Sequence, residues 1–182
     1  MCILVAGMHR SGTSALTRVL GLVGAGLPRN PLKANAHNET GFWEPEPIVM
    51  LHEELLREIG SRWNDIGRLD LSGLSPERLR HYKAEIIRIL REEYGDSRVF
   101  VVKDPRICLL APLWIEALTD AGIGVRFVLP LRDATEVARS LAARDLSSMQ
   151  QGYLMWLRHL LEAERASRSH RRVFLHYSDL LQ

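Results

Sequence analysis

The first residues that could do chemistry form the stretch "GMHRSGTS", from Gly7 to Ser14. Its two glycines have the G-x-x-x-x-G spacing of a loop that turns backbone N–H groups toward a phosphate. The positive end of the helix dipole that follows such a loop reinforces these donors. The hydroxyl of Ser11 can add another donor, and Arg10 adds a planar guanidinium that suits phosphate or sulfate oxygens. The stretch therefore predicts an anion site.

The same loop departs from those that bind ATP. A P-loop NTPase places a Lys directly before its magnesium-binding Ser or Thr, and here Thr13 occupies the lysine position. Thr13 cannot neutralise a terminal phosphate. Arg10, three residues earlier, could supply that charge from the apex of the loop, toward the terminal group of a shorter anhydride. Alternatively, the stretch from Gly7 to Ser14 is a glycine-containing turn that binds no ligand.

This loop resembles the 5′-phosphosulfate loop of sulfotransferases that use 3′-phosphoadenosine 5′-phosphosulfate (PAPS), in which Lys or Arg followed by Ser-Gly-Thr-Thr/Ser binds the phosphosulfate. In the same family a strand ends in an Arg, and a Ser eight residues later helps it to hold the 3′-phosphate. The stretch "FVLPLRDATEVARSL" has this spacing in Arg132 and Ser140. Arg132 would lie at the carboxyl edge of a parallel strand, where ligands bind, and Asp133 could cap the next helix. Two such sites suit a ligand phosphorylated at both ends of its ribose, which ATP is not.

The likeness extends over nearly the whole chain, from Ile3 to Leu181. "VFVVKDPRICLLAPLW" matches a family strand that ends in Lys, and "RRVFLHYSDLL" resembles a late strand of the family. The resemblance implies PAPS as donor, adenosine 3′,5′-bisphosphate as product, and no required metal. Family members continue with segments that hold the adenine, so we expect the C-terminal part of the fold to be missing. The residues expected to bind the donor are Gly7, His9, Arg10, Ser11, Gly12, Thr13, Ser14, Arg132 and Ser140.

Sulfuryl transfer to an alcohol, phenol or amine needs a base for the acceptor proton and cations for the charge on the departing phosphate. Arg10 and Lys103 are the expected cations, because both follow strands that should end near the first loop. Lys103 could instead pair with its neighbour Asp104 or with a carboxylate of a helix.

The base is harder to identify. Cytosolic members of the family carry a His two residues after the strand's Lys, but Pro105 stands there in this chain. Golgi-type members use a Glu after the first helix, where this chain has "NETGFWEPEP". Glu44 is the preferred candidate, because its neighbour Trp43 would raise the pKa of the carboxyl toward the working range; a helix-dipole role for Glu44 stays open. The rival candidates are Glu39, Glu46, Asp104, His9 and His37.

Composition limits the possible partners. The 182 residues, 46% hydrophobic and 25% charged, suit a single domain over residues 1–182. A formal net charge of +2 is too small to indicate nucleic-acid binding. Cys2 and Cys108 have no metal-ligand spacing and are expected to be reduced. No apolar run approaches the ~18 to 20 residues that span a bilayer, so we expect a cytoplasmic protein without a membrane partner.

Apolar runs alternate with segments of helical periodicity. Strands that are apolar on both faces, joined by helices, predict a parallel sheet with helices on each side. The expected fold is therefore a three-layer α/β/α domain like that of the P-loop NTPases. Strands are expected at 3–6, 99–102, 125–129 and 173–175, and helices at 13–23, 47–59, 76–93, 109–121, 134–143 and 150–167.

Two irregular stretches and one apolar stripe complete the pattern. The loop 28–45, with Phe42 and Trp43, is expected to form the acceptor pocket or its lid, and the loop 62–76 to be a cover or a mobile segment. Trp114 and a stripe along the last helix are expected to pack in the core. The stripe consists of Tyr153, Trp156, Leu157, Leu160 and Leu161.

Three functions remain open. The first is a PAPS-dependent sulfotransferase that acts on a small molecule, a glycan or a protein. The second is a P-loop kinase or NTPase, in which Asp104 would hold magnesium with Ser14 as its partner. The third is a non-catalytic P-loop-like domain that binds a nucleotide or a partner protein.

Overall fold

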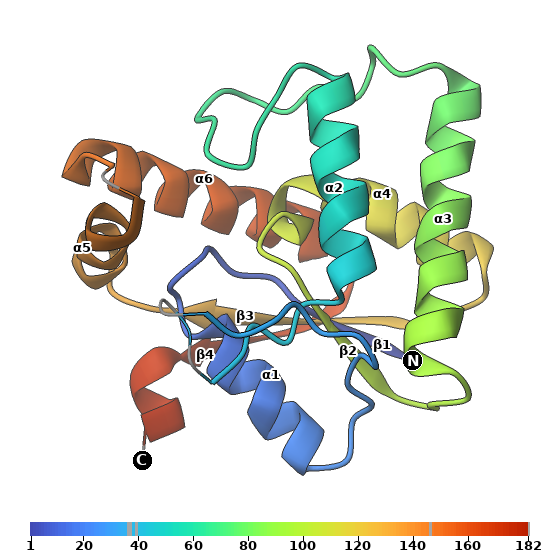
Figure 1. Ribbon diagram of the computed structural model, residues 1–182, viewed down its shortest axis with the longest axis horizontal. Helices are drawn as coiled ribbons and strands as arrows, with labels where there is room; N and C mark the ends of the chain where they lie inside the picture. The colour runs from blue at the N-terminus through green and yellow to red at the C-terminus, as the bar shows by residue number, and fades with distance from the viewer. Residues whose placement is uncertain (36–37, 39, 146, 182) are drawn as a thin grey trace.

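The structure is a computed structural model that describes residues 1–35, 38, 40–145 and 147–181. Within these residues the strands form one parallel sheet in the order β2-β1-β3-β4 (Figure 1). All four strands point the same way, so their carboxyl ends meet at one edge. The strands are β1 (Cys2–Val5), β2 (Phe100–Lys103), β3 (Val125–Leu131) and β4 (Arg171–His176).

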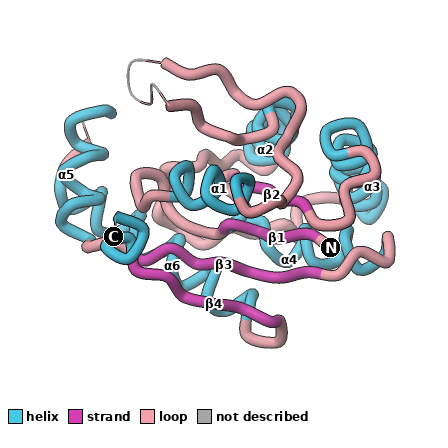
Figure 2. Tube along the Cα trace, turned by 90° about the horizontal axis from the view of Figure 1, so that it is seen from below, coloured by secondary structure: helices cyan, strands magenta, loops and turns pink. Residues whose placement is uncertain are grey.

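Helices lie on both sides of the sheet (Figures 1 and 2). One face is covered by α1, and α2, α3, α4 and α6 lie on the opposite side. This arrangement confirms the expected three-layer α/β/α fold with a central parallel sheet. The helices are α1 (Thr13–Leu22), α2 (Glu46–Glu58), α3 (Pro76–Tyr94), α4 (Ile107–Asp120), α5 (Ala134–Asp145) and α6 (Met149–Ser167), and a 3-10 turn, η1 (Tyr177–Leu181), follows β4.

The alternation of side chains along β1 explains the layers. Cys2 and Leu4 point into the larger core, which α2, α3 and α4 complete, whereas Ile3 and Val5 point toward α1. Because both sets are apolar, β1 can lie at the centre of the sheet with a helical layer on each face. Burying a large apolar side chain in this way stabilises the folded state by roughly 1.5 to 3 kcal/mol.

Serine residues cap the N-termini of the two longest helices. At the start of α3 the hydroxyl of Ser75 accepts a hydrogen bond from the backbone N–H of Arg78, and Pro76 occupies the first turn. Ser148 caps α6 in the same way, by accepting from the N–H of Gln151. Among the described residues, no helix is both long enough and apolar enough to cross a bilayer.

The prediction that every strand is buried on both faces is wrong for β4. Val173 is 53% exposed and Phe174 is 40% exposed. Edge position alone is not the reason, because β2 is the other edge strand and is buried. The difference is the cover, since α1 packs mainly against β1 and β2 and not against β4. An apolar run cannot by itself separate a central strand from an edge strand.

The prediction for the α6 stripe is also partly wrong. Tyr153, Leu157 and Leu161 are exposed, whereas Trp114 on α4 is fully buried, as expected. The helix buries its other face, including Met155 and Ala163. The spacing correctly predicts a helix, but it does not say which side of that helix meets the core.

Candidate functional site

The glycine loop joins β1 to α1 at the carboxyl edge of the sheet. Its backbone is left-handed at Arg10, with φ of +69°, and at Gly12, with φ of +83°. A Cβ atom on Gly12 would lie 2.2 Å from Cδ2 of Tyr177, and one on Gly7 would lie 2.7 Å from Cγ of Pro130. Both glycines are therefore needed, because neighbouring side chains occupy the space that a larger residue would fill.

The structure brings the two predicted anion sites together. The guanidinium of Arg10 donates through Nε to Oγ of Ser140 over 2.7 Å. Nη1 of Arg132 donates to the carbonyl oxygen of Arg10 over 2.9 Å. The residues of the loop and of the β3–α5 connection thus lie in direct contact, although about 130 positions separate them in the chain.

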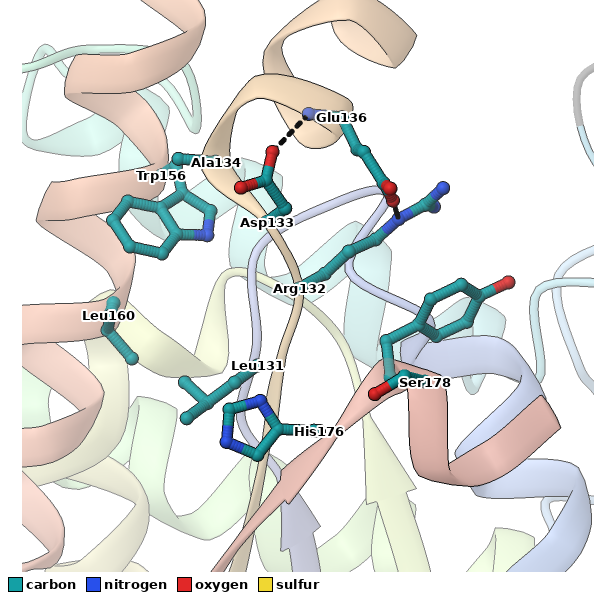
Figure 3. Close-up of a pocket in the computed structure, with 10 residues that line it drawn as sticks. Leu131, Arg132, Asp133, Ala134, Glu136, Trp156, Leu160, His176 and Ser178 are labelled. Atoms are coloured by element: carbon teal, nitrogen blue, oxygen red, sulfur yellow. Dashed lines mark hydrogen bonds and ion pairs between the residues drawn. The ribbon is translucent and has the colours of Figure 1, made fainter. Parts of the chain in front are cut away.

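Arg132 is held from two further sides. Its Nε forms an ion pair with Glu136, one turn along α5, at 2.8 Å (Figure 3). The guanidinium carbon lies 4.4 Å from the centre of the Tyr177 ring, within the range of a cation–π contact. Tyr177 therefore touches residues of both predicted anion sites, since its ring also packs against Gly12. The place of Tyr177 directly after an apolar run marks it as a strand-end residue in the sequence, but it was not among the residues predicted to bind the donor.

Lys103, at the end of β2, makes a buried ion pair with Glu44. The Nζ atom lies 2.5 Å from Oε1 of Glu44, and the two residues are 2% and 3% exposed. Nζ also donates to the carbonyl oxygen of Phe42 over 3.1 Å and to Oγ of Ser14 over 3.2 Å. Lys103 therefore links the loop before α2 to the first turn of α1.

The position of Glu44 argues against one of its two expected roles, that of stabilising the helix dipole, and leaves the role of base untested. Pro45 is the N-cap of α2, and the carboxylate of Glu44 contacts Lys103 instead of the helix end. Burial raises the pKa of Glu44, although the charge of Lys103 and its hydrogen bond act in the opposite direction. A buried carboxyl with a raised pKa is suited to accept a proton.

Asp104, the residue after Lys103, is fully buried and does not line the cavity that Lys103 and Glu44 line. The side chain is fully buried, with Oδ1 accepting from the backbone N–H and Nη1 of Arg106 and Oδ2 bound to Nδ1 of His52 at 2.8 Å. Nε1 of Trp114 donates to Nε2 of His52, so the proton of this ring is on Nδ1 and points to Asp104. Burial by itself would raise the pKa of Asp104, but Arg106 and His52 outweigh it and lower that pKa. The structure thus does not place Asp104 as an accessible base.

His9 lines the small cavity at the glycine loop, which we call the cradle, and its surroundings favour the neutral ring. Burial lowers its pKa well below the ordinary value, and the charges of Arg106, Arg144 and Lys103 lower it further. The Nε2 atom is buried and has no hydrogen-bond partner in the part of the chain that the structure describes. The ring packs edge-on against Trp63, with 4.6 Å between the ring centres.

Two cavities open at this edge of the sheet. The smaller, of about 210 Å³, is the cradle itself, and a larger one of about 890 Å³ lies between β3, β4 and α6 (Figure 3). Arg132 and Tyr177 line both cavities and form the boundary between them. The cradle is lined by His9, Arg10, Gly12, Thr13, Ser14, Ala15, Asn38, Thr40, Phe42, Glu44, Lys103, Arg132, Arg144 and Tyr177.

The other candidates lie outside this group. Glu46 is exposed in the first turn of α2, where a carboxylate serves the helix dipole. Glu39 and His37 lie outside the described residues, so their predictions stay untested. Arg144, from the end of α5, lines the cradle and was not predicted, because nothing in its sequence neighbourhood marks it.

Comparison with known proteins does not assign the chain to a family. No family model matches the chain, and no curated protein matches it in sequence. Within the described part of the chain, no three His, Cys, Asp or Glu side chains gather so that they could hold a metal ion. The interpretation of the site therefore rests on its own residues.

Proposed function

We propose that this protein is a sulfotransferase that moves a sulfuryl group from PAPS to a hydroxyl or amine acceptor. The observation that carries the proposal is the meeting of Arg10, Arg132 and Ser140 beside the buried Lys103–Glu44 pair. Three groups that suit anions and a buried carboxylate thus lie at a single edge of the sheet, and this supports the proposal. A nucleotide with phosphates at both the 3′ and 5′ positions suits such a site.

The hydrogen-bond donors of the protein suit the two phosphorylated ends of that ligand. Backbone N–H groups of a loop before a helix, together with Arg10 and Ser14, suit the 5′ end. Arg132 and Ser140 suit the 3′-phosphate, since a guanidinium binds phosphate oxygens through two parallel N–H groups. Gly12 leaves no room for a side chain between the loop and Tyr177, and this fits a cradle formed by backbone.

Two cations are available for the charge that develops in the reaction. The donor, when bound, supplies the sulfuryl group and is released as adenosine 3′,5′-bisphosphate. The acceptor oxygen bonds to sulfur as the bond between sulfur and the 5′-phosphate oxygen breaks, and that oxygen keeps the electron pair. Lys103 and Arg10 are the groups placed to stabilise this oxygen electrostatically, because both line the cradle. His9 is neutral and does not contribute a charge.

Glu44 is the base of the proposal. Its carboxylate lines the cradle and lies against Lys103, so a proton removed from the acceptor would arrive next to a cation. A positioned base of this kind typically contributes a factor of about 10² to 10⁴ in rate. The raised pKa strengthens Glu44 as a proton acceptor once it is ionised.

The kinase or NTPase alternative has less support from the site. Both carboxylate oxygens of Asp104 are already bound inside the protein, so this residue is not available to hold magnesium with Ser14. Thr13 is buried and carries no charge for a terminal phosphate. The Lys103 ammonium comes from β2 and not from the loop, and it is already paired with Glu44.

Calorimetry tests the proposal. We expect adenosine 3′,5′-bisphosphate to bind with micromolar affinity without metal, and PAPS to be consumed when phenols, sugars and amines are supplied as acceptors. ATP that binds only with magnesium, with no binding of the bisphosphate, would contradict the proposal and favour the NTPase. Bisphosphate binding with no PAPS consumption across the panel would favour the non-catalytic domain.

A further inference from the structure

One stripe of α5 lies beside the cradle. Glu136, Ser140 and Arg144 are four residues apart, so they share one face of the helix at steps of about 6 Å. The first forms an ion pair with Arg132, and the second accepts the hydrogen bond from Arg10. Arg144, one turn further along the helix, lines the cradle itself. The two predicted phosphate sites account for the first two positions of this stripe but not for the third.

Arg144 lies near the part of the cradle that contains Lys103. Burial is the main cause that lowers the pKa of His9, and the charges of Arg144 and Lys103 are among the further causes, so both cations are close to this ring. Lys103 in turn is paired with Glu44, the proposed base. The third position of the stripe is therefore close to the groups to which the proposal assigns the chemical step.

The indole of Trp63 lies against Arg144. The centre of its ring is 5.5 Å from the guanidinium carbon, within the range of a cation–π contact, and 4.6 Å from the centre of the His9 ring. The carboxylate of Asp65, two positions along the chain, accepts instead from the hydroxyl of Ser61. A cation–π contact uses the charge of a guanidinium and none of its N–H groups. Trp63 can therefore fix the position of Arg144 while the N–H groups donate to a ligand.

The lining of the cradle is rich in positive charge. Among the described residues that line it there is one carboxylate, Glu44, which pairs with Lys103. Glu136 pairs with Arg132 from outside the cradle. A lining of this kind suits a ligand that carries several anionic groups. The cations that line the cradle are Arg10, Lys103, Arg132 and Arg144.

The proposed donor has a third anionic group besides its two phosphates. PAPS carries negative charge on the 3′-phosphate, on the 5′-phosphate and on the oxygens of the sulfuryl group. In the proposed function Arg132 suits the first of these groups and Arg10 the second. Arg144 follows them in order along α5, and a planar guanidinium suits sulfate oxygens as well as phosphate oxygens.

We propose that Arg144 binds the oxygens of the sulfuryl group of the donor, and that Trp63 positions Arg144 for this contact. This inference rests on the proposed sulfuryl transfer. Arg10 and Lys103 stabilise the departing 5′-phosphate, and Arg144 orients the group that moves. Arg144 is then a catalytic residue, because it touches the reacting group, whereas Trp63 acts through Arg144 and is a positioning residue.

The test compares two ligands that differ in the sulfuryl group, PAPS and adenosine 3′,5′-bisphosphate. Calorimetry without an acceptor measures the Kd of each. In Arg144→Gln the Kd for PAPS should rise about tenfold, as expected for the loss of a hydrogen bond to a charged group. The Kd for the bisphosphate should change much less, because this ligand has no sulfuryl group. Arg144→Lys should lose less affinity for PAPS, since it keeps the charge but not the planar fork.

The control is Arg139→Gln, which removes an exposed arginine from the same helix. It should leave the affinity for both ligands unchanged. An unchanged affinity of Arg144→Gln for the bisphosphate also shows that this variant is folded. Equal losses of affinity for the two ligands in Arg144→Gln, or no loss for either, would overturn the inference.

Variants of Trp63 test the positioning role. Trp63→Phe keeps an aromatic face and should retain most of the affinity for PAPS, whereas Trp63→Leu should lose more of it and keep the affinity for the bisphosphate. In an Arg144→Gln background, Trp63→Leu should have little further effect on PAPS binding. Additive effects of the two substitutions would show that Trp63 does not act through Arg144.

Turnover separates this inference from the proposed function. If the wild type consumes PAPS but Arg144→Gln weakens both ligands equally, the sulfuryl transfer stands and the role of Arg144 is wrong. A selective loss of PAPS binding in Arg144→Gln, with no consumption of PAPS by the wild type with any acceptor, would support the sulfuryl contact and count against the transfer. Failure of the wild type to bind either ligand would overturn both.

Discussion

Arg10 and Ser140 are joined by a hydrogen bond of 2.7 Å from Nε to Oγ. One residue belongs to the loop after β1 and the other to α5, which follows β3. The bond is possible because β1 and β3 are parallel neighbours whose carboxyl ends lie side by side. Arg132 strengthens the same junction by donating to the carbonyl oxygen of Arg10. The residues of the two predicted anion sites therefore lie in direct contact.

Arg132→Ala should weaken the binding of adenosine 3′,5′-bisphosphate by about 1.5 to 3 kcal/mol, the range for a hydrogen bond to a charged group. Arg132→Lys should lose less, because it keeps the charge but not the planar pair of donors. Calorimetry with each variant measures the difference. Arg139→Ala, an exposed arginine of α5, is the control. Unchanged affinity in Arg132→Ala would contradict the two-site interpretation.

Glu44→Gln should lower kcat by a factor of about 10² to 10⁴, because the amide cannot accept the acceptor proton. In the wild type, the base works when ionised, so the rate should fall as the pH drops through its pKa. Since burial raises that pKa, the midpoint of this fall should lie above 4.5, the ordinary value for Glu. A pH profile of kcat/KM for the wild type measures the midpoint.

The matched control for this experiment is Glu46→Gln, since Glu46 is exposed in the first turn of α2. It should keep the wild-type rate and the acidic limb of the profile. Bisphosphate binding by Glu44→Gln checks that the loss of the partner of Lys103 leaves the fold intact. A large loss of rate in Glu46→Gln, with Glu44→Gln unaffected, would move the base to Glu46.

Gly12→Ala should destabilise the protein by about 2 kcal/mol or more, since it combines a left-handed backbone with a clash against the Tyr177 ring. In a Tyr177→Ala background the clash is gone and only the backbone cost remains, so the same substitution should cost less. Urea unfolding of the wild type, the two single variants and the double variant measures the interaction energy between positions 12 and 177. Additive effects would show that the ring does not restrict the loop. Gly67→Ala, where a Cβ meets no neighbour, is the control.

Asp104→Asn should destabilise the protein by up to about 3 to 5 kcal/mol at pH 7, because it removes the buried one of the two carboxylates that pair with Arg106 and leaves only Glu53. The pKa of Asp104 is lower in the folded state than the ordinary 3.8, so its stabilisation is complete above that pH and decreases as the pH falls below it. The difference in unfolding free energy between wild type and variant should therefore shrink below about pH 3.8.

Urea unfolding at several pH values measures this difference. Asp120→Asn removes an exposed partner of Lys83 and should cost less than about 1 kcal/mol. If the effect of Asp104→Asn were independent of pH down to the acid transition, the carboxylate would not be the stabilising species.

The sequence by itself determined the fold class and the cradle. A strand buried on both faces is apolar throughout, and a helix buried on one face has an apolar residue at every third or fourth position. Apolar runs separated by amphipathic segments therefore predict parallel strands and helices. Parallel strands end at one edge, so Arg10, Lys103 and Arg132 could be expected to lie near one another before any coordinates. The glycine spacing around Arg10 is likewise local, and it predicts the turn.

The tertiary structure alone decided the partners of these residues. It pairs Lys103 with Glu44 instead of Asp104, places Tyr177 against Gly12, brings Trp63 to His9, and leaves one side of α6 exposed. Each of these contacts joins segments that are distant in the chain, and at least one partner lies in an irregular loop or next to the edge strand. Their geometry depends on how whole elements pack, and no periodic pattern in the sequence records that packing.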